Sequence, residues 1–80
     1  MLEELKTASK VVGIKQLRKA LSAGTVTKVF LARDADPMLT EPIEKYCDET
    51  RTTVIYVATM KQLGAACEIS VPAAAAAIVQ

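Results

Sequence analysis

The sequence contains no histidine and no tryptophan, and only three of its 80 residues are aromatic, one Phe and two Tyr. Without histidine, the chain lacks the usual general base of enzymes and the commonest protein ligand of transition metals. Three rings are also too few to form the row of platforms on which many proteins stack single-stranded bases. These absences argue against a hydrolase, a redox enzyme or a metal protein. We therefore expect no catalytic activity, no cofactor and no bound metal.

Cysteine is scarce as well. Cys47 and Cys67 lie far apart in the sequence and do not form the closely spaced pairs that bind zinc. We expect both to be small buried residues in a reducing cytoplasm, and a disulfide between them is the less favoured alternative. The N-terminus is acidic and lacks the apolar segment of a signal peptide, and no apolar run reaches membrane-spanning length. The sequence predicts a cytoplasmic protein without a membrane partner.

Charge of one sign is not in excess, because ten Lys and Arg residues face nine Asp and Glu residues and the net charge is +1. The strongly basic tail that coats nucleic acid is therefore absent. Hydrophobic residues make up 51% of the chain, which is enough for the aliphatic core of one small domain over residues 1–80. Any site for a nucleic acid must concentrate its positive charge locally.

The stretch 12–24 is where positive charge is concentrated. Leu17, Ala20 and Leu21 follow helical spacing and predict a helix whose narrow apolar stripe faces a core. The opposite side of this helix carries what we call the cationic ridge, made of Lys15, Gln16, Arg18 and Lys19.

Glycines mark both ends of this predicted helix. Gly24 follows the last turn, where a residue in the left-handed conformation would end the helix. Gly13 precedes the first turn, where the absence of a Cβ lets another backbone come close. The free N–H groups of the first turn, the positive end of the helix dipole and the nearby lysines together predict a site for an anion such as a phosphate.

A solvated helix face is the commoner explanation of such a row of charges. Two details favour binding instead. No acidic residue lies within one turn of the cations, so the ridge is not neutralised by its own helix. The amide of Gln16 can offer a donor and an acceptor together to the edge of a base.

Helical and strand-like segments alternate along the chain. We expect helices at 2–10, 38–49 and 60–67 besides the one above, and strands at 11–12, 25–32, 53–58 and 73–79. Thr59 is expected to cap the helix at 60–67, and Thr40 with Pro42 predicts a restart within 38–49. We expect Ile43, Tyr46 and Cys47 to supply the buried side of that helix.

The C-terminal run of alanines is ambiguous. Five consecutive alanines favour a helix by propensity, but the run is short, follows Pro72 and is apolar on both faces. A strand that is buried on both faces has this pattern, and we expect a strand. The alternation predicts an α/β fold, a three-layer α/β/α sandwich with a mixed four-stranded sheet flanked by helices on both faces.

Three other segments have ordinary structural explanations. The loop 69–72, Ile-Ser-Val-Pro, is expected to turn its side chains inward, although it could form an apolar lip against an unstacked base. Asp34 and Asp36 supply too few oxygens for a calcium site and are expected to accept hydrogen bonds from backbone donors before Pro37. Gly64 interrupts a helix, and close packing on the sheet explains it better than phosphate binding.

Several spaced motifs resemble one family. The segment 13–20, Gly-Ile-Lys-Gln-Leu-Arg-Lys-Ala, resembles the Gly-x-Asn-Glu-x-x-Lys-Ala signature of the ribosomal L7Ae/L30e family of kink-turn RNA-binding proteins. Its Gly-x-Lys-Gln form is similar to that of the short bacterial members of the YbxF type. Segment 32–37 resembles the family's Ala-x-Asp-x-x-Pro turn, 60–64 its Lys-x-x-Leu-Gly helix start, and 69–78 its closing loop and strand.

The resemblance implies a small monomeric protein that binds kink-turns in structured RNA, in the ribosome, another RNA–protein particle or a riboswitch-type leader. It implies that the RNA backbone passes near Gly13, that the ridge contacts phosphates and the edges of tandem G·A pairs, and that loop 69–71 covers an extruded nucleotide. The RNA-binding residues it implies are Gly13, Lys15, Gln16, Arg18, Lys19, Ile69, Ser70 and Val71.

The chain also departs from the family pattern. Lys15 stands where Asn is common, Gln16 where Glu is common, and Ser70 where the loop usually has an acid. Glu68 and Pro72 replace glycines of that loop. The near-neutral charge and the altered loop favour the alternative hypothesis, a protein-interaction module of the same fold that has no RNA affinity.

Overall fold

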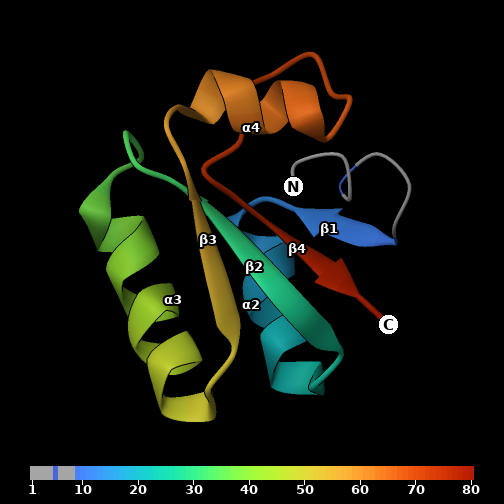
Figure 1. Cartoon of the computed structure of the whole chain (residues 1–80), viewed down its shortest axis with the longest axis vertical. Coiled ribbons are helices and arrows are strands. Elements are labelled where there is room, and N and C mark those ends of the chain that lie inside the picture. The colour runs from blue at the N-terminus through green and yellow to red at the C-terminus, as the bar shows by residue number, and fades with distance from the viewer. Residues whose placement is uncertain (1–4, 6–8) are drawn as a thin grey trace.

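The computed structural model describes Leu5 and residues 9–80. Most of the helix expected at 2–10 lies outside these residues, but its predicted end was wrong, because Lys10 begins a strand. The elements in chain order are β1 (Lys10–Val12), α2 (Ile14–Ala23), β2 (Val26–Ala32), α3 (Pro37–Thr50), β3 (Thr53–Val57), α4 (Met60–Ala66) and β4 (Ala75–Val79), as Figure 1 shows.

The four strands form one mixed sheet in the order β1-β4-β2-β3. Strands β2 and β3 are parallel, whereas β4 is antiparallel to both of its neighbours. The alanine-rich segment is a strand, as expected, and Ala75, Ala76 and Ala77 are completely buried in it. Because β4 is a central strand covered on both faces, burial and pairing outweigh the helix propensity of alanine.

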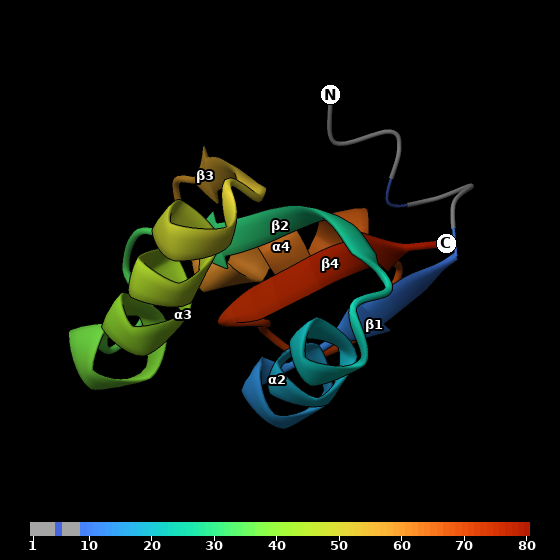
Figure 2. The same cartoon turned by 90° about the horizontal axis from the view of Figure 1, so that it is seen from below.

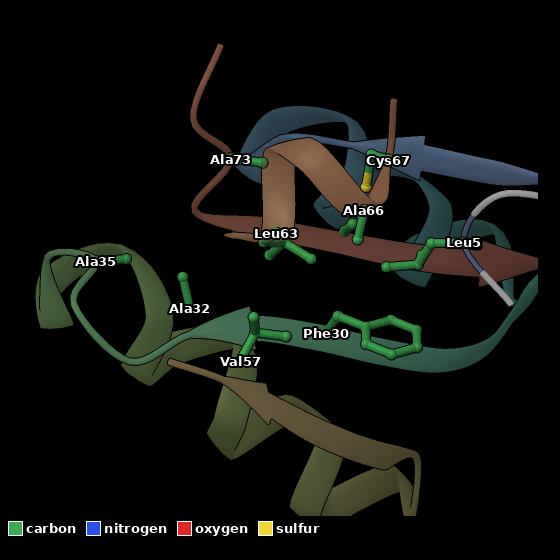
Figure 3. Close-up of a cluster of buried hydrophobic side chains, with 10 residues drawn as sticks. Leu5, Phe30, Ala32, Ala35, Val57, Leu63, Ala66, Cys67 and Ala73 are labelled. Atoms are coloured by element: carbon green, nitrogen blue, oxygen red, sulfur yellow. The ribbon is translucent and has the colours of Figure 1, made fainter. Parts of the chain in front are cut away.

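Helices cover both faces of the sheet (Figure 2). One buried cluster joins the sheet to Leu17 of α2 and to Ile43 and Cys47 of α3. The other cluster lies between the sheet, α4 and Leu5, and Figure 3 shows Phe30 of β2 pointing into it together with Leu63. These two clusters confirm the three-layer sandwich and its aliphatic core.

Helix α3 differs from expectation at its start. It begins at Pro37 and runs through Pro42 without a restart. Asp36 caps it, because its Oδ1 accepts a hydrogen bond of 2.9 Å from the Met38 N–H, while Thr40 forms no cap. The ring of Pro42 removes only the donor that would pair with the Met38 carbonyl, and Met38 is exposed to solvent, so the helix tolerates the loss.

The buried side of α3 is smaller than predicted. Ile43 and Cys47 are buried, but Tyr46 is 42% exposed. Its hydroxyl donates a hydrogen bond of 3.3 Å to the Leu21 carbonyl at the end of α2. Tyr46 therefore joins the two helices at the surface, where its ring is half covered and its polar end is satisfied.

Both cysteines are free and buried, as expected. Cys47 is 0% and Cys67 3% exposed, and burial raises the pKa of each thiol. Because the thiolate is the reactive form, we expect neither cysteine to react with Ellman's reagent in the native protein and both to react on unfolding in guanidinium. The absorbance of the released thiolate measures this, and fast labelling without denaturant would contradict the buried positions.

Candidate nucleic-acid interface

The segments that the sequence predicted to be functional lie together at one end of the strands of the sheet. Because β4 is antiparallel to β1 and β2, and β2 is parallel to β3, the start of β4 meets the ends of the other strands. The Gly13 N–H donates to the Ala75 carbonyl at 2.8 Å, and the Ala32 N–H donates to the Ala74 carbonyl at 2.9 Å. These bonds place the start of α2, the loop 33–36 and the segment before β4 at the same end of the sheet, where β4 begins.

Gly13 fixes how the chain enters α2. Its φ of 99° and ψ of 153° lie in a region that essentially only glycine occupies. A Cβ built there would meet no atom within 4 Å, so the backbone angle requires glycine and no protein backbone lies close to it. The space beside Gly13 is therefore open, and the approach of another backbone to this position stays a prediction.

The first turn of α2 has unused hydrogen-bond donors. Gly13 is the N-cap residue and provides no side-chain cap, and the first intrahelical bond runs from the Leu17 N–H to the Gly13 carbonyl at 2.9 Å. The N–H groups of Ile14, Lys15 and Gln16 consequently have no acceptor within the part of the chain that the structure describes. They point along the positive end of the helix dipole.

The cationic ridge is arranged as its spacing predicted. All four of its residues are exposed, while the apolar stripe of Leu17, Ala20 and Leu21 is buried. Among residues 9–80 and Leu5, no carboxylate forms an ion pair with the ridge. Its positive charge therefore remains available to a ligand.

Arg18 stands apart from the rest of the ridge. It lines a hollow of about 260 Å³ between α2 and α3, together with Leu21, Pro42 and Tyr46. Lys15, Gln16 and Lys19 do not line this hollow. The structure therefore divides the ridge into a part at the start of α2 and a flank that faces α3.

The loop before β4 turns one side chain inward and exposes two others, so each of the two predictions for this loop holds for part of it. Ile69 is half-buried and packs against the cluster under α4, whereas Ser70 and Val71 are exposed, Val71 by 60%. The loop borders a shallow hollow of about 360 Å³ whose other wall includes Lys61 and Ala65 of α4. Lys61 lies inside the 60–64 motif, but its spacing in the sequence gave no sign that it belongs to this site.

Gly64 explains how the loop is held. A Cβ at this position would overlap the Val71 carbonyl oxygen and lie 3.2 Å from the Cα of Pro72. Gly64 therefore packs closely as expected, but against the loop and not against the sheet. Its carbonyl also accepts a hydrogen bond of 3.1 Å from the Ile69 N–H.

The acidic residues of the turn at 33–36 act as backbone acceptors. Asp36 caps α3, and the Oδ1 of Asp34 accepts a hydrogen bond of 2.7 Å from the Met60 N–H at the start of α4. Thr59 caps α4 as predicted, accepting from the Gln62 N–H at 3.0 Å. No group of three or more His, Cys, Asp or Glu residues that could hold a metal ion occurs in the described chain.

With this geometry in place, comparison with known proteins assigns the family. Residues 2–80 match the model of the Ribosomal protein L7Ae/L30e/S12e/Gadd45 family. The chain belongs to this family.

Relatives of this L7Ae-family chain are similar over most of their length. The chain is 44% identical over 68 residues to an RNA-binding protein of Bacillus pumilus, and the match covers 85% of this chain and 83% of that protein. It is 43% identical over 70 residues to the RNA-binding protein YbxF of Geobacillus stearothermophilus, covering 88% of this chain and 85% of that protein. These identities confirm the resemblance to the short bacterial members.

A solved structure supports the fold of this L7Ae-family chain. The Giardia lamblia 15.5kD RNA binding protein superposes with a TM-score of 0.88 at 26% sequence identity, covering 99% of this chain and 70% of that one. Within the described residues, no helix is both long enough and apolar enough to cross a membrane.

Proposed function

We propose that this L7Ae-family protein binds kink-turn motifs in structured RNA and holds them in the bent form, without catalysing a reaction. The observation that carries the proposal is the start of α2. There, exposed cations and three N–H groups that have no partner among residues 5 and 9–80 lie together with the open space beside Gly13. The names of the bacterial relatives and of the Giardia protein support RNA as the ligand.

The shape of RNA explains why the end of a helix is suited to recognising a kink. The major groove of ordinary A-form RNA is too narrow for a protein helix, so RNA is recognised where its shape departs from A-form. A kink opens that groove and brings two phosphate backbones close together. A rigid helix end that contacts both backbones binds the bent form better than the straight form, and this difference stabilises the bend.

Each ridge residue has a role that its position permits. Lys15 and the free N–H groups beside it are placed for a phosphate at the helix start. Gln16 and Lys19 lie three residues apart, on neighbouring turns, and can reach the edges of the G·A pairs in the groove. Arg18 reaches a phosphate on the flank that faces α3.

The loop before β4 supplies the second contact. Val71 is exposed and, with Ser70, offers a small surface on which an extruded base can pack, while half-buried Ile69 anchors the loop to the core. Lys61 lines the same hollow and adds a cation for the phosphate of that nucleotide. The first turn of α2 and this loop would then hold the RNA from two sides.

The salt dependence of binding tests the electrostatic part of the proposal. With about three phosphates neutralised, we expect the logarithm of the association constant to fall with the logarithm of salt at a slope of about −2 to −3. Between 50 and 200 mM salt, the affinity for a kink-turn RNA should then fall by about 15- to 60-fold. Filter binding or fluorescence anisotropy measures the slope.

A protein-interaction module of the same fold is the second candidate, because the net charge of the chain is only +1. If the chain is such a module, the folded protein should show no salt-sensitive binding to RNA. A flat salt profile, or no binding at low salt, would favour this candidate and contradict the role of the ridge.

A further inference from the structure

The sequence of the outer strand β3 carries none of the usual features that prevent a further strand from pairing with its edge. Strand β3 is the last strand of the described sheet, and its residues 53–57, Thr-Val-Ile-Tyr-Val, all favour strands and include no charge, proline or glycine. Natural sheets usually protect such an edge with a lysine, a proline or a bulge, or cover it with a helix; here α3 lies beside β3 but leaves hollows between them (Figure 1). At the opposite edge, β1 has only three residues and one of them is Lys10.

The backbone of β3 presents a row of unused groups. The Val57 carbonyl accepts a hydrogen bond of 2.8 Å from the Arg33 N–H, so it faces β2. Because backbone groups alternate in direction along a strand, the N–H and C=O groups of Val54 and Tyr56 face away from β2. In the described chain no strand lies beyond β3, so these two donors and two acceptors are available to a further strand.

A groove runs beside this edge. Helix α3 flanks the outer side of β3 in Figure 1, and two hollows of about 460 Å³ each lie between them. Glu44 and Tyr56 line both hollows, so the two are neighbours along the strand. Arg33 lies in the wall of one hollow, and Lys45 and Asp48 lie in the wall of the other.

Two side chains in the groove are held in place by contacts with each other and with α3. The Tyr56 hydroxyl donates to Glu44 Oε2 at 2.7 Å, and the guanidinium carbon of Arg33 lies 4.7 Å from the centre of the Tyr56 ring. Thr40 also lines the first hollow and is only 7% exposed.

The surroundings favour one kind of occupant. Two acids, Glu44 and Asp48, and two cations, Arg33 and Lys45, line the groove, so it lacks the excess of positive charge that the phosphates of an RNA require. A second copy of this chain paired antiparallel through β3 would bring its own α3 to the same face, where α3 already flanks the edge. A single extended segment brings no helix with it and avoids this overlap.

We propose that the outer edge of β3 and the groove beside it bind an extended peptide segment of another protein, which adds a fifth strand to the sheet. Main-chain bonds to Val54 and Tyr56 provide affinity, and the two hollows accept alternate side chains of the peptide. A carboxylate of the peptide pairs with Arg33 at the end of the groove.

Peptides selected from a displayed library of random linear sequences provide the probe. We expect selected peptides, added at about 100 times their Kd, to slow amide hydrogen exchange at Val54 and Tyr56 by about 100-fold, with little change at Ile55. NMR of the ¹⁵N-labelled protein measures each amide. Selected peptides that leave these two amides unprotected would overturn the proposal, as would protection of the same amides by RNA or by self-association of the protein alone.

The matched variant is Val54→Pro, which removes an outward donor without removing a bond of the native sheet. We expect it to weaken peptide binding by about tenfold while thermal unfolding stays cooperative. Arg33→Ala, at an exposed loop position, is the second variant and should weaken peptides that carry a carboxylate. Unchanged peptide affinity in a folded Val54→Pro protein, or in Arg33→Ala if the first does not fold, would contradict the proposal.

Discussion

Replacing Lys19 with alanine is expected to weaken binding to a kink-turn RNA by about 1–3 kcal/mol, the scale of one good base-edge contact. Lys19 is exposed on α2 and has no acidic partner among the residues that the structure describes, so its charge is not used to stabilise the fold. The free energy of unfolding should therefore change little. Isothermal titration calorimetry with one RNA on both proteins measures the difference in affinity.

The control for this experiment is Lys45→Ala. Lys45 is also an exposed lysine on a helix, but it lies on α3 beside the edge strand and outside the proposed RNA surface. Its removal changes the net charge by the same amount, so it measures the general electrostatic effect alone. An equal loss of affinity in the two variants would show that Lys19 acts only through net charge, and no loss in either would contradict its assigned role.

Replacing Gly64 with alanine is expected to destabilise the protein by about 2–3 kcal/mol, because backbone atoms must move to make room for the methyl group. The added Cβ overlaps the Val71 carbonyl oxygen, which belongs to a loop backbone and not to a flexible side chain. The loop that we propose to cover a nucleotide should shift away from α4, so RNA affinity should fall as well. Urea unfolding and RNA titration measure the two effects.

Helix propensity predicts the opposite sign for this substitution, a gain of about 1 kcal/mol for alanine over glycine. The neighbouring variant Ala65→Gly measures the difference in helix propensity between alanine and glycine directly, because Ala65 is exposed on the same helix. We expect Ala65→Gly to lose about 1 kcal/mol, and Gly64→Ala to lose more. A Gly64→Ala protein that is more stable than the wild type would show that the loop does not pack on α4 as described.

The sequence predicted the parts of the fold that depend on local patterns. The amphipathic spacing of Leu17, Ala20 and Leu21 placed α2, and its ends at Gly13 and Gly24 are where the glycines indicated. The C-terminal alanines could be assigned to a strand because they are apolar on both faces. In these cases the local pattern and the tertiary burial agree.

Predictions failed where tertiary contacts decide the outcome. Pro42 suggested a break in α3, but a single lost donor at an exposed turn does not end a helix whose other side is buried. Gly64 signalled a close contact, and the sequence could not show that the contact is the loop 69–72. The β3 edge and its groove were also invisible in the sequence, because strand order is fixed by long-range pairing.

The candidate site could be predicted only in part. The composition of the ridge indicated its exposure, and the structure shows that no acid from the rest of the described chain neutralises it. Lys61 was missed because its proximity to the loop comes from the fold and not from spacing. Which ridge residues contact RNA stays a prediction for the variants above.

The most direct test is titration of a kink-turn RNA against the same RNA with its tandem G·A pairs replaced by Watson–Crick pairs. The replaced RNA keeps the length and charge of the first but does not bend. We expect at least about 30-fold weaker binding to it, since two recognised pairs are lost at about 1–3 kcal/mol each. Equal affinity for the two RNAs would contradict recognition of the kink by the start of α2.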